Sequence, residues 1–307
     1  MSMTPFRFLT ADIFTSKRFG GNQLAVLPDA RGLTTEQMLA ITREFNYSES
    51  TFVLPPDNPA NTRRVRIFTP GGELPFAGHP TVGSAFVLAT IGEIPLTGDE
   101  TRIVLEEGVG PVPVVIRMRN GKPAFCQFSV AKLPEVGPPL PSRAALAAVL
   151  SLSEDDLLDG AWHPQVVSCG LPFAFVPVRD RGAVARSRIR LDQWEKHLSG
   201  HQGENVMIFA MDPEEPGHDV RARMYGPGPK VNVPEDPATG SACAALGGYL
   251  AARARPGDGT LRWVVEQGYE MGRPSLIEVE ADRSGQQITA VRVGGDSVLV
   301  SEGQITV

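Results

Sequence analysis

The stretches that decide the fold are His79-Pro80-Thr-Val-Gly83-Ser84-Ala85 and Asp236-Pro237-Ala-Thr-Gly240-Ser241-Ala242, which lie 157 positions apart. At the same offset, and without a gap, Arg64-Val-Arg66-Ile-Phe-Thr-Pro70-Gly71 matches Arg221-Ala-Arg223-Met-Tyr-Gly-Pro227-Gly228. Eight of the 22 positions that this alignment spans are identical. Because the offset is about half of the chain length, we infer that one structural unit was duplicated and that the chain folds into two similar domains.

Short alternating or β-branched runs predict that both halves consist mostly of strands. Helices are expected after the capping-box pattern Thr34-x-x-Gln37 and from Asp236 to about Arg253. The proline-rich segment Lys132–Ser142 predicts a loop between two domains, residues 1–120 and 121–307. Strands and one long helix per half favour an α+β fold over a doubly wound sheet. The expected strands are Phe6–Phe14, Leu24–Leu27, Thr51–Leu54, Arg64–Phe68, Ile103–Glu106, Val112–Met118, Phe173–Val178, Asn205–Ala210, Arg221–Tyr225, Leu261–Glu266, Leu276–Glu280, Ile288–Val293 and Ser297–Val300.

Composition narrows the class of protein. The chain is 42% hydrophobic and 21% charged, as in globular proteins, and its net charge of -6 argues against nucleic acid as a main partner. We expect no membrane partner, since no run of about 18 apolar residues occurs and the first residues do not resemble a signal peptide. The three cysteines, Cys126, Cys169 and Cys243, form neither a disulfide framework nor a zinc pattern, which favours a reducing cytoplasm.

The two duplicated stretches predict two helix starts that carry different titratable groups. Pro80 and Pro237 suit the first helical position, which would place Asp236 at an N-cap. Capping alone would explain Asp236, and His79 could be a satisfied buried residue. The small residues that follow leave first-turn N–H groups open to a carboxylate or phosphate, although they would also allow close helix packing.

A further candidate is Glu49, which has an apolar counterpart in the second half, Val206. A carboxylate beside a strand is usually a surface residue. If it is buried, its pKa rises and it can act as an acid and base near neutral pH.

Four motifs together resemble the PhzF family, to which the isomerase of phenazine biosynthesis belongs. They span the chain in the family's order, and any one alone would be weak evidence. The motifs are Phe14-x4-Phe19-Gly-Gly-Asn22-Gln-Leu-Ala25-Val26, Asn46-Tyr-Ser-Glu49-Ser-Thr51-Phe52-Val53, Ala77-Gly78-His79-Pro80-Thr81 and Asp236-Pro-Ala-Thr239-Gly240-Ser241-Ala242.

The resemblance implies a fold like that of diaminopimelate epimerase. That fold has two similar domains related by a pseudo-two-fold axis, each a curved or barrel-like, mainly antiparallel sheet around a central helix. The resemblance also implies an active site in the cleft between the domains, a homodimer, and a last strand near 298–307 that returns to the first domain.

The resemblance further implies roles for individual residues. Glu49 matches the glutamate that acts as general acid and base, and His79 and Asp236 match polar catalytic partners that face the substrate. Substrate-binding positions are expected at Gly78, Gly240 and Ser241, with Ser48 and Thr239 beside them, and Ser168 is a candidate from the loop Pro164–Pro172. Epimerase relatives use a cysteine near each helix start, and both places lack one here.

These features predict a cofactor-independent isomerase that moves a proton on a small, cyclic, unsaturated carboxylate such as trans-2,3-dihydro-3-hydroxyanthranilate. Two alternatives stay open: an amino-acid racemase or epimerase on the same fold, and a protein that binds a small molecule without catalysis. No nucleotide-binding glycine motif occurs, and no metal site is expected.

Overall fold

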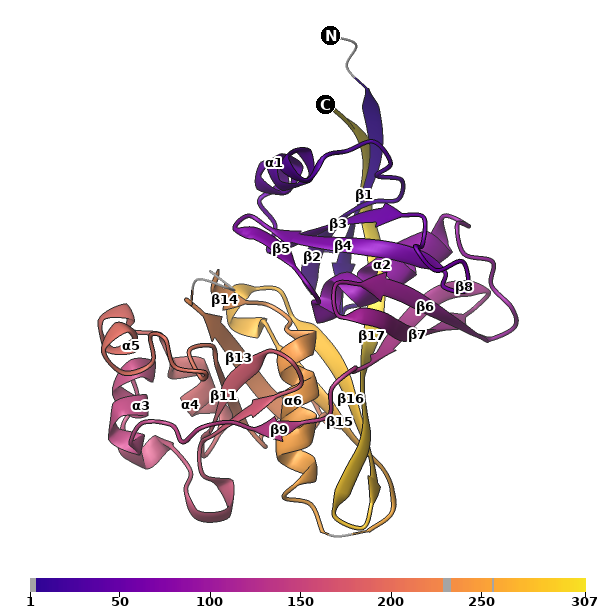
Figure 1. Cartoon of the computed structure of the whole chain (residues 1–307). Coiled ribbons are helices and arrows are strands. Elements are labelled where there is room, and N and C mark those ends of the chain that lie inside the picture. The colour runs from indigo at the N-terminus through magenta and orange to yellow at the C-terminus, as the bar shows by residue number, and fades with distance from the viewer. Residues whose placement is uncertain (1–3, 229–232, 256) are drawn as a thin grey trace. The chain divides into compact units, whose positions relative to one another are not determined.

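A computed structural model describes residues 4–228, 233–255 and 257–307, and in this part the chain forms two compact units. Unit 1 comprises Met1–Ser129 and Gly294–Val307, and unit 2 comprises Val130–Val293. The two units are described one at a time below. Figure 1 shows the chain coloured from its N-terminus to its C-terminus. No helix in the described part is long and apolar enough to span a membrane.

Unit 1 contains a closed ring of eight strands. Its order is β17–β1–β2–β3–β4–β6–β7–β8 and back to β17, with parallel pairing between β2 and β3 and between β4 and β6. A short ninth strand, β5, pairs with β4. The strands are β1 (Pro5–Ile13), β2 (Asn22–Leu27), β3 (Glu49–Leu54), β4 (Arg63–Thr69), β5 (Gly72–Leu74), β6 (Glu100–Glu107), β7 (Gly110–Arg119), β8 (Lys122–Ser129) and the part from Gly294 onward of β17 (Gln287–Thr306), whose first residues belong to unit 2.

Helix α2 (Gly78–Thr90) is the core of unit 1, because every residue from Gly78 to Ala89 is buried. It contacts strands on several sides of the ring, including β1, β2, β3, β7 and β8. A helix that is apolar all round must be enclosed to be stable in water. A Cβ at Gly83 would lie 2.5 Å from Leu24 Cδ2, so this glycine permits the close packing of helix and strand.

Helix α1 (Thr35–Phe45) covers the other surface of unit 1 with an amphipathic face. Its capping box is present as expected, with Thr34 as the N-cap and Gln37 as its partner. Met38 and Ile41 pack against Phe52 and Phe68. The N-terminal end of β1 pairs with the end of β17, and Thr4 and Val307 are hydrogen-bonded, so the two ends of the chain lie together (Figure 1).

Unit 2 repeats the same order of strands. Strands β9 to β13, β15 and β16 pair in sequence, with parallel pairing between β11 and β12 and between β13 and β15. Strand β14 pairs with β13 as β5 pairs with β4. The strands are β9 (Glu135–Val136), β10 (Gln165–Ser168), β11 (Pro172–Pro177), β12 (Val206–Ala210), β13 (Val220–Gly226), β14 (Val233–Asp236), β15 (Gly259–Gln267) and β16 (Ser275–Ser284).

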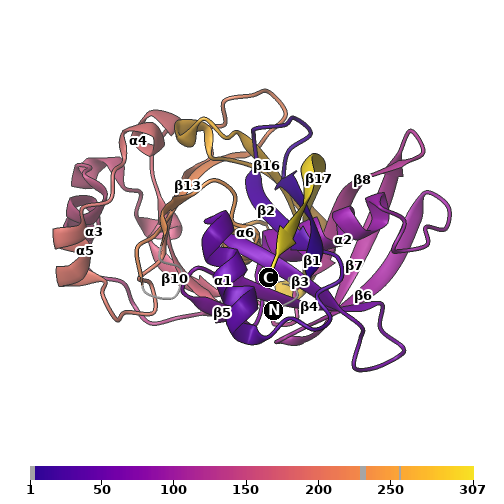
Figure 2. The same cartoon turned by 90° about the horizontal axis from the view of Figure 1, so that it is seen from above.

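Helix α6 (Gly240–Ala251) takes the place of α2 in unit 2 and contacts β10, β11, β15 and β16. Smaller helices cover the outside, and α3 and α5 lie side by side in both views (Figures 1 and 2). The remaining helices are α3 (Arg143–Leu150), α4 (Arg181–Arg186) and α5 (Leu191–His197), with 3₁₀ turns at Glu154–Asp156, Gly160–Trp162 and Tyr269–Met271. The α+β fold with a closed barrel around a helix is therefore confirmed.

The expected strands are present, but two predictions about helix starts were wrong. Asp236 is the last residue of β14 and not an N-cap; Thr239 occupies the N-cap and α6 begins at Gly240. Helix α2 begins at Gly78, so His79 lies within the helix and Pro80 is its third residue. Proline is tolerated there because the first four N–H groups of a helix have no partner inside it.

A carboxylate holds the same loop in each unit. Glu106 accepts the N–H groups of residues 57 and 58 and the side-chain amide of residue 61. Glu266 accepts the N–H groups of residues 214 and 215 and lies 2.7 Å from Nδ1 of residue 218. The three donor positions differ by the 157-residue offset of the sequence repeat, so the duplication extends to individual hydrogen bonds.

These two carboxylates differ in burial, which leads to a prediction. The Glu266 side chain is fully buried, whereas Glu106 is half-buried. Glutamine would turn an NH2 group toward a backbone N–H and leave a buried donor unsatisfied. We expect Glu266→Gln to lower the free energy of unfolding by about 3 kcal/mol and Glu106→Gln to lower it by less. Urea unfolding measures the stability of both variants. Equal losses of stability would contradict the conclusion that the two carboxylates differ in burial.

Candidate active site

The candidate site has one set of residues in each unit. In unit 1, Glu49 begins β3 and pairs with Leu24 of β2, which brings it close to the first turn of α2. Its Oε2 lies 3.6 Å from Nε2 of His79, just beyond hydrogen-bond distance. The Glu49 side chain is 16% exposed and that of His79 is 4% exposed. The structure therefore places the two expected catalytic residues of unit 1 side by side.

Two polar residues complete this arrangement. Asn22, the first residue of β2, is buried, and its Nδ2 lies 3.3 Å from Nδ1 of His79. Ser48 Oγ donates to Asn22 Oδ1 over 3.0 Å. Asn22 therefore links Ser48, an expected substrate-binding residue, to His79. Its position in the Phe19-Gly-Gly-Asn22 motif was visible in the sequence, but the motif gave no sign of these contacts.

Burial sets the charge of His79. Desolvation lowers its pKa to about 3, although a hydrogen bond with the backbone of Gln23 opposes the shift. The imidazole is therefore neutral at physiological pH. It can exchange hydrogen bonds with a substrate or with Glu49, but it does not supply a positive charge.

A second buried group, Glu107, holds the first turn of α2. Side chains alternate along β6, so Glu106 faces the loop described above and Glu107 faces the helix. Thr81 Oγ1 lies 2.7 Å from Glu107 Oε1 and 2.8 Å from the Ala77 carbonyl oxygen. Desolvation raises the pKa of Glu107 to about 8, against the hydrogen bond of Thr81. A neutral Glu107 can donate to Thr81, which then donates to Ala77.

In unit 2, Gln267 occupies the place of Glu107, since it follows Glu266 as Glu107 follows Glu106. Its Nε2 donates to the Asp236 carbonyl oxygen and its Oε1 accepts from the N–H of Thr239. Thr239 Oγ1 donates to Asp236 Oδ2 over 2.5 Å. These bonds, together with the pairing of Asp236 with Met224, hold residues 236–239 outside the helix, which explains the late start of α6.

The other expected substrate-binding residues lie at the start of a helix or at the end of a strand. Gly78 is the first residue of α2, and Gly240 and Ser241 are the first two of α6. Ser241 is partly exposed. Ser168 ends β10, and its Oγ accepts the N–H of Gly170. The roles assigned to these residues remain predictions.

Cysteine chemistry is disfavoured at this site. Cys126 and Cys243 are buried, and burial raises the pKa of both thiols far above the usual range. Burial also raises the pKa of Cys169 to about 12. A thiolate is the reactive form of cysteine, so none of the three suits a two-thiol racemase mechanism. The described residues contain no group of His, Cys, Asp or Glu that could hold a metal ion.

Comparison with known proteins identifies the family. The family model "Phenazine biosynthesis-like protein" matches residues 11–303. The chain belongs to this family. It is 40% identical over 305 residues to an uncharacterized isomerase of Mesorhizobium japonicum, with 97% of this chain and 98% of the relative covered. It is 33% identical over 299 residues to the trans-2,3-dihydro-3-hydroxyanthranilate isomerase of Pseudomonas aeruginosa, with the same two coverages.

Solved structures agree on the fold. A PhzF-family protein of Bacillus anthracis superposes with a TM-score of 0.89 at 24% identity, covering 99% of both chains. A predicted epimerase of Pseudomonas aeruginosa superposes with a TM-score of 0.78 at 30% identity, covering 98% of this chain and 99% of that one. The epimerase-like fold is therefore confirmed. The family model and the named isomerases confirm the expected family and the isomerase class.

The low pKa of His79 gives a prediction about titration. The imidazole signals of His79 in NMR spectra should not move between pH 5 and pH 8, because the group stays neutral throughout. The partly exposed His197 serves as the internal comparison. A midpoint for His79 near pH 6.5 would show that the ring is hydrated and not buried beside Glu49.

Glu107 gives a prediction about stability. Its pKa is raised in the folded protein, so its stabilising contribution is complete below about pH 4.5 and is lost as the pH rises to about 8. Glu107→Gln, which copies Gln267, removes this loss. We expect the variant to gain on the order of a few kcal/mol relative to the wild type between pH 5 and pH 8. Thermal or urea unfolding of both proteins at pH 5 and pH 8 tests this prediction. A difference in stability between variant and wild type that is the same at both pH values would refute it.

Proposed function

We propose that this protein is a cofactor-independent isomerase that shifts a proton between two carbons of a small, unsaturated, carboxylate-bearing ring. The supporting observation is the position of Glu49, a mostly buried carboxylate 3.6 Å from the neutral His79 at the start of a helix. A carboxylate in such surroundings can accept a proton and return it. The name of the Pseudomonas aeruginosa relative suggests trans-2,3-dihydro-3-hydroxyanthranilate as a substrate of this chain.

In the proposed reaction, Glu49 removes a proton from a carbon next to the unsaturated system. The C–H electron pair forms a new double bond, and the existing double bond moves along the ring. The protonated Glu49 then delivers the same proton to the carbon at the far end, so atoms and electrons balance without any co-reactant. One acid/base suits such an allylic shift better than racemisation, which needs acceptors on both faces.

The other residues would bind and polarise the substrate. His79 would hold Glu49 or a substrate hydroxyl through hydrogen bonds, and Asp236 would accept a hydrogen bond from the substrate. The N–H groups at the starts of α2 and α6, at Gly78 and Gly240, would bind the carboxylate, since a helix N-terminus favours an anion. We propose that the sets of residues in both units act on one substrate molecule in an interdomain cleft.

Substitution of Glu49 tests the proposal. We expect Glu49→Gln to lower kcat/KM for trans-2,3-dihydro-3-hydroxyanthranilate at least about a hundredfold, because glutamine cannot accept the proton. Turnover is followed by absorbance. Glu44→Gln is the matched control, because it makes the same change on the exposed surface of α1 and should leave the rate unchanged. Full activity in Glu49→Gln would exclude Glu49 as the base.

A further inference from the structure

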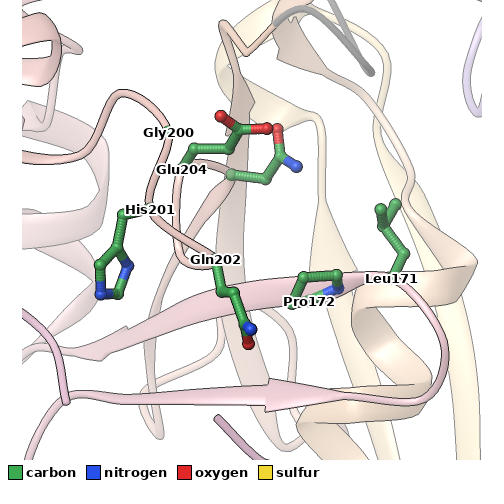
Figure 3. Close-up of a pocket in the computed structure, with 7 residues that line it drawn as sticks. Leu171, Pro172, Gly200, His201, Gln202 and Glu204 are labelled. Carbon is green, nitrogen blue, oxygen red and sulfur yellow. The ribbon is translucent and has the colours of Figure 1, made fainter. Parts of the chain in front are cut away.

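Unit 2 contains a cavity of about 270 Å³ whose polar side chains have no role in the proposed reaction. Figure 3 shows it between the loop that carries Gly200 to Glu204 and the hairpin that carries Leu171 and Pro172. It is called the β11–β12 cavity here, because its walls lead into those two strands. Its polar lining comes from His201, Gln202, Glu204 and Asn205.

The strand registers show which part of unit 1 corresponds to this cavity, namely the region around Glu49. In unit 1, β2 pairs with β3 in parallel, with Leu24 opposite Glu49. In unit 2, β11 pairs with β12 in parallel, with Ala174 opposite Val206. The cavity therefore lies at the place in unit 2 where Glu49 and its neighbours lie in unit 1.

The same registers match individual residues. Two positions before Leu24 stands Asn22, and two positions before Ala174 stands Pro172. One position before Glu49 stands Ser48, and one position before Val206 stands Asn205.

This difference in residues leaves the side-chain oxygen of Asn205 without a hydrogen-bond partner among the described residues. In unit 1, Ser48 bonds to the side chain of Asn22. Proline has no side-chain donor or acceptor, so Pro172 cannot make the equivalent bond to Asn205. Asn205 is 2% exposed, and its Oδ1 has no hydrogen-bond partner among the residues that the structure describes. A buried amide in this condition costs free energy unless a ligand or water satisfies it.

The charge in the cavity is negative. Glu204 supplies a carboxylate, and none of the described residues that line the cavity is Lys or Arg. Nδ1 of His201 accepts the N–H of Gly203, so Nε2 carries the proton and donates to the Pro139 carbonyl oxygen. The ring is therefore neutral, and Figure 3 shows it turned away from the Glu204 carboxylate.

Hydrogen bonds hold the backbone of Glu204 and Asn205 in the wall of the cavity. The Glu204 carbonyl accepts from Trp194 Nε1 over 2.7 Å, and the Asn205 carbonyl accepts from the N–H of Ala174 over 2.8 Å. A glycine leaves room for the acidic side chain, because a Cβ at Gly228 would lie 2.8 Å from the Glu204 carboxyl carbon. A cavity with a rigid frame loses little entropy when it binds a ligand.

We propose that the β11–β12 cavity binds a small primary amine as its ammonium ion. An ammonium group has three donors and no acceptor. It matches the Glu204 carboxylate and the side-chain oxygen of the neighbouring Asn205. A free amino acid fits less well, because its carboxylate would lie near Glu204. None of the polar residues that line the cavity has a role in the proposed isomerase reaction, and the test does not involve turnover.

The probe is 1,4-diaminobutane, added to the full-length protein during a ¹H–¹⁵N NMR titration. We expect saturable shifts at Leu171 and at Gly200–Asn205, and binding at least about tenfold weaker in 0.5 M salt than at low salt. The neutral analogue 1,4-butanediol should not bind. Equal binding of the diol, or shifts located elsewhere, would overturn the proposal.

Variants identify the groups responsible. Glu204→Gln should weaken diamine binding at least about tenfold, and Asn205→Ser, which copies Ser48, should weaken it by a smaller factor. Glu195→Gln is the matched control, because it removes the same charge from the exposed surface of the neighbouring helix α5. Unchanged thermal unfolding confirms that each variant is folded. Wild-type affinity in a folded Glu204→Gln protein would refute the assignment.

Discussion

Enclosing an apolar helix within a ring of strands is the constraint on which the other features depend. Helix α2 is buried on all sides, so no part of its first turn can rely on bulk water. Its first-turn groups must be satisfied by neighbouring side chains or by a ligand. In unit 1, Glu107 satisfies the buried hydroxyl of Thr81 in the first turn of α2, and in unit 2, Gln267 satisfies the N–H and the hydroxyl of Thr239, the N-cap of α6. The chemically useful residues lie at the same places.

Desolvation shifts the pKa of a buried histidine and the pKa of a buried carboxylic acid in opposite directions. It lowers the pKa of His79 and raises that of Glu107, because in each case the neutral form is favoured. The helix start in unit 1 is therefore lined with neutral groups near physiological pH. A carboxylate substrate of the proposed kind would therefore be held there by N–H groups and not by a cation.

The sequence predicted the duplication and the positions of most strands, and the resemblance to the PhzF family implied that Glu49 and His79 belong to one site. These follow from local patterns and from motifs whose order is preserved. It did not predict that α2 begins at Gly78 or that Asp236 ends a strand, because those limits depend on hydrogen bonds from β6, β13 and β15. Glu107 and Gln267 were missed for a related reason. They align only after a three-residue change in offset, and their roles depend on which face of the strand they occupy.

The strand β17 has a consequence for synthesis of the protein. Unit 2 ends at Val293, whereas the ring of unit 1 needs Gly294–Val307 between β1 and β8. During translation, the N-terminal half of the chain therefore emerges first but cannot close its barrel until the last segment has left the ribosome. Until then, β1 and β8 expose unpaired edges, which are the features of a nascent chain that chaperones protect from aggregation. The domain that is made first is completed last.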